Sequence, residues 1–301
     1  MMDGESKIKK NRVSRVSKRV KRISALFLAP SFSGVALFFF IPFTVVIYYS
    51  LVDNPVSKSF VGLDNFKSVL ANKAFQLAVT NTVKFSAISV PLVVILSLLA
   101  ALGLTQRLPF GSKIRSALLS PMMVPIASII LIWQVLFHYN GVVNEILSHF
   151  DVSKIDWFKS EHAPIIIVVL FVWKNLGYNM VLFMAAIAAI PKELLEVARL
   201  ESAGDLRIFF SIKIRYLAST ILFVTILSLI NSFKVFREIY LLTGDYPYSS
   251  LYMLQHYMNN MFRSLDYQKL SAAAIIMSLV MIVLVGLLFL IEYFVGRDVD
   301  E

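Results

Sequence analysis

The sequence predicts an all-α membrane protein with six transmembrane helices. Of its 301 residues, 58% are hydrophobic and 16% are charged, whereas soluble globular chains are about 45–50% apolar and about 25% charged. The surplus lies in long runs with almost no charge, and a helix needs roughly 20 such residues to cross a bilayer. Because backbone groups in lipid must bond internally and no alternating barrel-strand pattern occurs, these runs predict helices.

Six segments are expected to cross the membrane: residues 25–51, 85–104, 116–137, 163–191, 216–233 and 270–291. The first is about twice as long as the apolar stretch of a cleavable signal peptide, and no small-x-small cleavage pattern follows it. We therefore predict one transmembrane domain over residues 25–295, between a basic tail at 1–24 and a short tail at 296–301.

The distribution of basic residues orients the chain. Nine of its 29 Lys and Arg residues lie within the first 22 positions, directly before an apolar run, which is typical of a membrane flank rather than of a nucleic-acid-binding surface. If the N-terminus is inside, the inner segments carry 18 Lys and Arg residues and the outer segments carry 8. This bias predicts a multi-pass protein of the cytoplasmic membrane with both ends in the cytoplasm.

The basic tail has a pattern of its own. Apolar residues recur at roughly helical spacing among its Lys and Arg residues, at Ile8, Val13, Val16, Val20 and Ile23. An amphipathic helix lying on an anionic inner leaflet and a solvated basic tail are both compatible with this pattern.

Polar side chains share one helical face on the fourth span and one on the fifth. The six candidates for a solute path are Asn175, Tyr178, Asn179, Ser228, Asn231 and Ser232. Polar groups inside a span are costly and mark a functional site when they face a cavity. The alternative is hydrogen bonding between packed helices, which contributes about 1 kcal/mol or less per contact. Lys174 and Lys234 lie near the ends of their spans and are expected to snorkel.

Enzyme chemistry has no support in the sequence. There is no Cys, no G-x-x-x-x-G-K-[ST] phosphate loop and no H-E-x-x-H pair among the four His residues. A G-x-S-x-G nucleophile elbow is also missing. We therefore expect no catalytic residue, no metal and no cofactor on this chain.

Residues 192–215 differ from the other loops. Pro191 followed by acidic residues is typical of a helix start, and Leu194, Leu195, Ala198 and Leu200 offer an apolar face. A break follows at 202–205, where Gly and Asp favour a turn. By physical chemistry alone, this helix suits docking into a partner's groove and lying on the lipid surface equally well.

This loop resembles the EAA loop of ABC importer permeases, whose pattern is E-A-A-x3-G-x9-I-x-L-P. Glu196, Val197 and Ala198 fill the first three places, and Ser202 stands at the Gly. The spacing extends to Ile212, Ile214 and Arg215, where the last two depart from the pattern, as do Val197 and Ser202. Gly204 is expected to supply the turn in place of Ser202. The resemblance implies contact with an ATPase through Glu196, Val197, Ala198, Ser202, Ala203 and Gly204.

Further segments resemble carbohydrate importer permeases, over about residues 25–295. Phe60 to Phe66 match an F-x-G-L-x-N-F segment similar to that of the maltose-permease F-type subunit. The other matches are Asn81-Thr82, Pro121, Pro125, Gly141-x-x-Asn144, Trp173-x-x-x-Gly177, Ile190-Pro191 and Leu242-Thr243-Gly244. The resemblance implies one permease of an importer, with a G-type second permease, two ATPase subunits that bind ATP and Mg, an extracytoplasmic solute-binding protein and a sugar substrate.

The resemblance also bears on the path. Tyr178, Ser228 and Ser232 match sugar-contacting positions of the maltose permease, whereas Val235 replaces an Asn. A permease of this kind for another solute, such as glycerol phosphate or a peptide, is the first alternative. A self-contained channel or carrier is the second, but it is disfavoured because the expected spans contain no internal Asp or Glu to couple ions.

Overall fold

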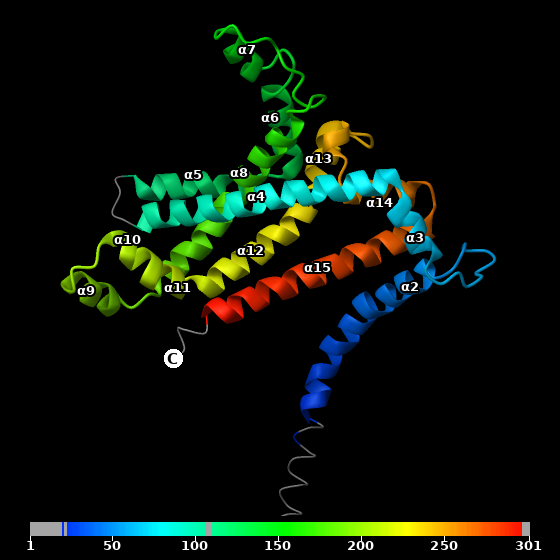
Figure 1. Cartoon of the computed structure of the whole chain (residues 1–301), viewed down its shortest axis with the longest axis horizontal. Helices are drawn as coiled ribbons and strands as arrows, with labels where there is room; N and C mark the ends of the chain where they lie inside the picture. The colour runs from blue at the N-terminus through cyan, green and yellow to red at the C-terminus, as the bar shows by residue number, and fades with distance from the viewer. Residues whose placement is uncertain (1–19, 21–22, 106–109, 297–301) are drawn as a thin grey trace, which may run out of the picture.

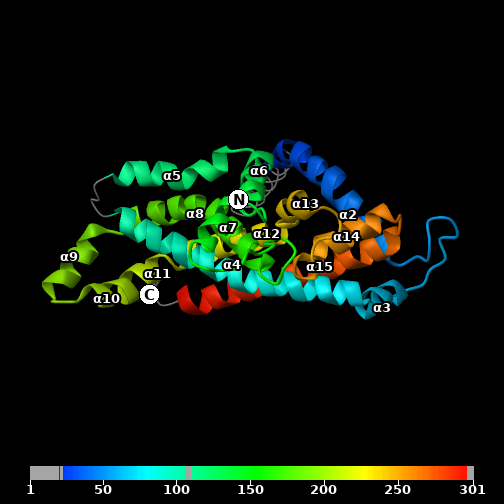
Figure 2. The ribbon, with the colours of Figure 1, turned by 90° about the horizontal axis from the view of Figure 1, so that it is seen from above.

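The computed structural model describes residues 20, 23–105 and 110–296, and the described chain is helical with no strand longer than a single bridge between Val52 and Phe60. The predicted tails at 1–24 and 296–301 therefore fall almost wholly outside the described residues. The helices form an elongated bundle (Figures 1 and 2), in which α9–α11 lie at one end and α3 and α14 at the other. We call these the α9 end and the α14 end.

Five helical stretches are long and apolar enough to cross a membrane: Ile23–Ser50, Lys73–Thr105, Ala163–Ala188, Ala218–Thr243 and Tyr267–Phe294. The second and third are α4 (Lys73–Thr105) and α8 (Ala163–Ala188), which pack along each other through the core. α12 (Ala218–Phe233) packs against both, and α15 (Tyr267–Gly296) covers α12. Each of these five stretches overlaps one of the apolar runs in the sequence.

The third predicted span is not one straight helix. Neither α5 (Gly111–Met123) nor α6 (Ile126–Leu136) is long enough to cross a membrane alone. The two together are long enough, but a bend of 104° separates them. Val124 is extended, with φ −93° and ψ 132°, and Pro125 begins α6. The cause is local: a proline ring clashes with a helical preceding residue and drives it to extended backbone. The span predicted at 116–137 is therefore made of two helices joined at a sharp bend.

Three other spans are clearly longer than predicted, and the last of them runs from Tyr267 to Phe294. α4 begins twelve residues before position 85, since Lys73 starts it. After α12, only two residues precede α13 (Phe236–Thr243), and the two together make one span-length stretch to Thr243. Glu238 therefore lies inside a span, which corrects the expectation that the spans hold no internal acid.

The N-terminal span leaves the bundle (Figure 1). Its second half contains a π-helical turn, η1 (Ala36–Phe40), followed by α2 (Ile41–Ser50). Pro42 explains the wide turn, because proline cannot donate a helical hydrogen bond and crowds the preceding turn. α2 contacts α15 near the α14 end, whereas the span's apolar surface elsewhere is exposed.

Short helices complete the two ends. Those at the α14 end are α3 (Asp64–Ala71), η3 (Ser249–Leu251) and α14 (Leu254–Arg263), and α7 (Val142–Ser148) follows α6. Those at the α9 end are α9 (Lys192–Leu200), α10 (Asp205–Ile208), the π-helical η2 (Phe209–Lys213) and α11 (Ile214–Tyr216).

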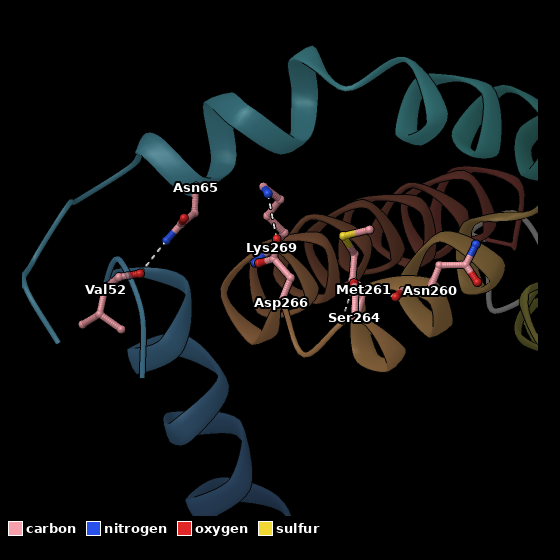
Figure 3. A network of polar contacts seen from close by, with 7 residues as sticks. All are labelled: Val52, Asn65, Asn260, Met261, Ser264, Asp266 and Lys269. Carbon is pink, nitrogen blue, oxygen red and sulfur yellow. Dashed lines mark hydrogen bonds and ion pairs between the residues drawn. The ribbon is translucent and has the colours of Figure 1, made fainter. Parts of the chain in front are cut away.

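Asn side chains hold the α14 end together. Asn65 donates to the carbonyls of Ser50 and Val52 at 2.9 and 2.8 Å, which ties α3 to the end of α2 (Figure 3). Asn81 donates to the carbonyls of Ser249 and Tyr252. The carbonyls of Ser50, Val52 and Tyr252 lie where helices begin or end, so the Asn residues take the place of missing backbone partners there. The Ser249 carbonyl also accepts from the Tyr252 N–H within η3.

In the α6–α7 connection, too, an Asn side chain donates hydrogen bonds to backbone carbonyls. Asn144 is fully buried and donates to the carbonyls of Tyr139 and Ile155, while its oxygen accepts from the Trp157 indole at 3.1 Å. Asn144 and Gly141, like Asn65 and Asn81, belong to segments that resemble importer permeases. In the described structure these motif residues position backbone and do not line either of the two larger cavities.

Gly177 sets the approach of α5 to α8. A Cβ atom at Gly177 would lie 2.0 Å from the carbonyl oxygen of Leu118 and 3.1 Å from the Cα of Leu119. Both contacts are with backbone, which cannot move aside as a flexible side chain can. Small residues permit close backbone approach between membrane helices, so Gly177 fixes where α5 lies.

We expect Gly177→Ala to lower the stability of the protein by roughly 1–3 kcal/mol, because overpacking forces backbone shifts. The measurement is thermal unfolding of the detergent-solubilised protein, followed by tryptophan fluorescence. Gly286→Ala is the matched control, since nothing lies within 4 Å of a Cβ atom there. Equal unfolding temperatures for Gly177→Ala and Gly286→Ala would contradict the close-packing argument.

His256 on α14 is a buried neutral base. Its side chain is fully buried, its Nδ1 accepts from the Met253 N–H at 3.2 Å, and its ring packs edge-on against Phe236. Burial lowers the pKa of His256 to about 4, and the nearby Asp245 carboxylate opposes this only in part. The folded protein therefore binds the proton more weakly than the unfolded chain, whose His pKa is about 6.5.

A folded pKa below the unfolded pKa means that stability is fully present above about pH 6.5 and falls as the pH drops toward 4, by up to about 3 kcal/mol. We expect the unfolding temperature of the wild type to fall over this window and the slope to flatten in His256→Asn, which keeps an acceptor for Met253. His149→Asn, at an exposed position, should leave the slope unchanged. An unaltered slope in His256→Asn would refute this assignment.

Candidate functional site

A cavity of about 810 Å³ lies where the α5–α6 bend faces α8 and the α12–α13 junction. α8 contributes Lys174, Asn175 and Tyr178, and the α12 side contributes Asn231. The cavity's other charged lining residues are Lys234, Arg237 and Glu238. Its apolar lining includes Pro121, Met122, Ile129, Leu170 and Phe171. The α5–α6 bend at Pro125 thus forms one side of the cavity.

Three of the six predicted path residues meet in this cavity. Asn231 donates to the Asn175 oxygen at 3.2 Å, which links α12 to α8, and the Asn175 amide donates to the carbonyl of Phe171. Tyr178 is 39% exposed, and no hydrogen bond of its hydroxyl appears among the described residues. An aromatic ring beside two amides is an arrangement suited to a polar solute with apolar faces.

The other three predicted residues lie in helix packing. Asn179 donates to the Ser228 hydroxyl at 2.9 Å, and the Ser232 hydroxyl pairs with that of Ser86 on α4 at 2.8 Å. Asn179, Ser228 and Ser232 are each at most 2% exposed. In this structure they connect α8, α12 and α4, as expected for polar groups between membrane helices, and none reaches the cavity.

Lys174 and Glu238 form an ion pair across the cavity wall. The Lys174 side chain is 29% exposed and that of Glu238 is 6% exposed. A buried carboxylate needs an opposite charge nearby, and Lys174 provides it, so snorkelling was the wrong prediction for Lys174. Sequence reasoning missed Glu238, because counting the fifth span to residue 233 left it outside. The amphipathic pattern of 236–243 was the available signal.

A second cavity, of about 880 Å³, lies at the α9 end. It is lined by the last turns of α4 and α8 and by the starts of α5 and α9, with Arg115, Lys192 and Lys213 as its charged residues. On α8 its lining includes Val181 and Ala185. Positions 174, 178, 181 and 185 share one helical face, so the two cavities follow the same side of α8.

The loop at the α9 end is helix, turn and helix, as predicted, but the turn has a different centre. Ser202 adopts the left-handed conformation with φ +60°, whereas Gly204 is extended at φ −68° and precedes α10. The Ala203 N–H bonds to the carbonyl of Ala198, which closes α9. A helix commonly ends on one left-handed residue, so Ser202 occupies the place that the pattern gives to Gly, and assigning the turn to Gly204 was wrong.

The exposed apolar face of α9 is also rotated from the prediction. Val197 and Leu200 are 53% and 85% exposed, and Leu194 is 39% exposed. Leu195 lines the second cavity and Ala198 is half-buried, so these two face the bundle. Leu194, Val197 and Leu200 thus form an exposed apolar stripe on α9. Glu196 is exposed beside this stripe, and Ala203 is half-buried in the turn. The described residues contain no cluster of three or more His, Asp or Glu side chains suited to a metal ion.

Comparisons with known proteins agree with this arrangement. A family model described as "Binding-protein-dependent transport system inner membrane component" matches residues 10–301. The trehalose/maltose transport system permease protein of Thermococcus litoralis is 33% identical over 242 residues, which cover 79% of this chain and 82% of the relative. The sulfoquinovosyl glycerol transport system permease protein of Agrobacterium fabrum is 30% identical over 264 residues, 85% of each chain.

A solved structure has the same fold. It is a bacterial ABC transporter involved in the import of the acidic polysaccharide alginate, and one of its chains matches with a TM-score of 0.80 at 21% identity, over 95% of this chain and 100% of that chain. The family model covers nearly the whole sequence and the fold agrees over the same length. This chain belongs to the family of binding-protein-dependent transport system inner membrane components and is a multi-pass permease subunit of an ABC importer.

Proposed function

We propose that this chain forms half of the pathway by which an ABC importer moves a saccharide into the cytoplasm. The observation that carries the proposal is the cavity between the α5–α6 bend, α8 and the α12–α13 junction, where Tyr178, Asn175 and Asn231 converge. Two of the relatives are named as permeases for trehalose/maltose and for sulfoquinovosyl glycerol. A second, G-type permease would enclose the open side of the path.

The residues divide into two roles. Tyr178 offers an aromatic face for a sugar ring, and the Asn175–Asn231 pair offers amide donors and acceptors for hydroxyl groups. Asn179, Ser228 and Ser232 hold α8, α12 and α4 in register. Glycerol phosphate and peptides remain alternative solutes for the same architecture.

The proposed orientation places the α9 end and both termini in the cytoplasm. The bias of Lys and Arg toward the inner segments supports this orientation, and the bent α5–α6 pair counted as one span gives the even number of crossings that it requires. Residues 25–295 then form one transmembrane domain, with residues 192–215 as its coupling loop. No cofactor is assigned to this chain, and ATP hydrolysis belongs to two separate ATPase subunits.

Coupling is assigned to the exposed stripe of α9. Val197 and Leu200 would insert into a groove of an ATPase subunit, with Glu196 at the rim and the Ser202–Gly204 turn setting the angle of α10. An amphipathic helix laid into an apolar groove is a recurring mode of recognition. An extracytoplasmic binding protein would deliver the solute at the α14 end.

For the path, we expect Tyr178→Ala and Asn175→Ala each to reduce ATP-dependent uptake by about tenfold, since each removes a solute contact worth about 1–1.5 kcal/mol. The measurement is uptake by the complete complex in proteoliposomes with its binding protein, together with subunit stoichiometry. Tyr246→Ala, at an 82% exposed position away from the cavity, is the control. Normal uptake in both cavity variants would show that the solute takes another route.

For coupling, we expect Val197→Glu and Leu200→Glu to abolish co-purification of the ATPase, because each buries a charge in an apolar contact. Uptake should be lost, while the unfolding temperature of the isolated permease pair stays unchanged. Glu193→Gln, on the same helix and exposed, should retain ATPase and uptake. Stoichiometric ATPase with both glutamate variants would remove α9 from the coupling role.

A further inference from the structure

The charges around the first cavity do not balance. Three cations line it, Lys174, Lys234 and Arg237, and Glu238 is its only acidic lining residue among the described part of the chain. Glu238 pairs with Lys174. Neither Lys234 nor Arg237 has an ion-pair partner among the residues that the structure describes. The cavity therefore carries an excess of two positive charges.

The apolar walls of the cavity strengthen the attraction of this excess positive charge for an anion. Leu170, Phe171 and Ile129 are buried and form a low-dielectric lining. Charge interactions are stronger beside such a lining than in water, and a cleft of one sign concentrates ions of the other sign. A guanidinium group beside an ammonium group suits carboxylate, sulfate and phosphate oxygens, which accept two parallel hydrogen bonds from Arg.

The bias continues along α8. The second cavity, on the same face of the helix, has three basic lining residues, Arg115, Lys192 and Lys213, and no acidic one within the described ranges. Basic residues at a cytoplasmic boundary also follow from membrane topology. The second cavity therefore shows that the basic lining continues along α8, but it is not independent support for an anionic solute. The first cavity is the informative one, because topology gives no reason for unpaired cations toward the opposite side of the membrane.

We propose that the solute is an acidic saccharide, whose carboxylate, sulfate or phosphate group contacts Lys234 and Arg237 while a sugar ring lies against Tyr178. The proposal rests on the proposed function of this cavity as the solute path. The ion pair then has a defined role, because Glu238 neutralises Lys174 and leaves the two outer cations for the solute. Lys234 and Arg237 are both exposed, so a solute can reach them.

The test uses the complete complex with its binding protein in proteoliposomes that contain ATP. A mixture of maltose, trehalose, lactose, digalacturonate, trehalose 6-phosphate and glycerol 3-phosphate is added outside, and the lumen is assayed by mass spectrometry. We expect digalacturonate or trehalose 6-phosphate to accumulate and the neutral sugars not to. Accumulation of glycerol 3-phosphate without either acidic saccharide would overturn this inference and the saccharide part of the proposed function. Accumulation of neutral sugars alone would overturn this inference and leave the proposed function intact. Accumulation of no species would overturn both.

Variants separate solute contact from subunit contact. We expect the double variant Lys234→Gln/Arg237→Gln to lose at least about tenfold in uptake of the acidic solute at low concentration, since each removes a charge-assisted hydrogen bond. Lys159→Gln, which removes a positive charge outside the cavity lining, is the control and should behave as the wild type. Loss of the second permease from the double variant would instead assign these cations to the subunit interface and overturn the proposal.

Discussion

A buried charge in a membrane helix must find its partner inside the protein, and the Lys174–Glu238 pair is where this constraint decides the architecture. Lys174 sits on α8, the most enclosed of the span-length helices, and Glu238 comes from the extension of α12 into α13. Satisfying the pair requires the start of α13 to lie within side-chain reach of α8 rather than to leave the bundle after residue 233. The amide contact between Asn175 and Asn231 reinforces the same alignment. The cavity is the space that these contacts leave between α8 and the α12–α13 junction.

The backbone geometry of α5 and α6 forms the other wall of this cavity. Gly177 brings α5 so close to α8 that no side chain fits between them, and Pro125 then turns the chain through 104°. Before the bend the backbones of α5 and α8 touch, and beyond it α6 meets α8 through side chains such as Trp133 and Trp173. A close approach followed by a break thus opens a polar pocket without an empty apolar void, which would cost stability. Pro125 explains why α5 and α6 cannot form a single straight helix, and Gly177 explains why α5 lies so close to α8.

Polar residues in this protein serve three separable purposes. Asn65, Asn81 and Asn144 satisfy carbonyls where helices end, and Asn179, Ser228 and Ser232 join helices in the core. Only Asn175, Tyr178 and Asn231 among the predicted path residues, with the charged residues beside them, reach the cavity. In lipid, where unsatisfied polar groups are costly, the first two purposes are obligatory. The third is the one that bears on solute, and it is distinguished from the others by exposure rather than by residue type.

The membrane class, the approximate place of the spans, the polar faces of α8 and α12, and the helix–turn–helix at 192–215 could all be predicted from the sequence, because hydropathy, helical period and turn residues are local properties. The family could be predicted as well, from motifs whose order is preserved along the chain. Which polar residues face the cavity and which lie between helices could not be predicted, since residues one turn apart on a helix, such as Asn175 and Asn179, have the same pattern but different neighbours. The partner of Lys174, the turn at Ser202 and the exposed stripe of α9 likewise depend on how distant segments pack, and no local pattern records that packing.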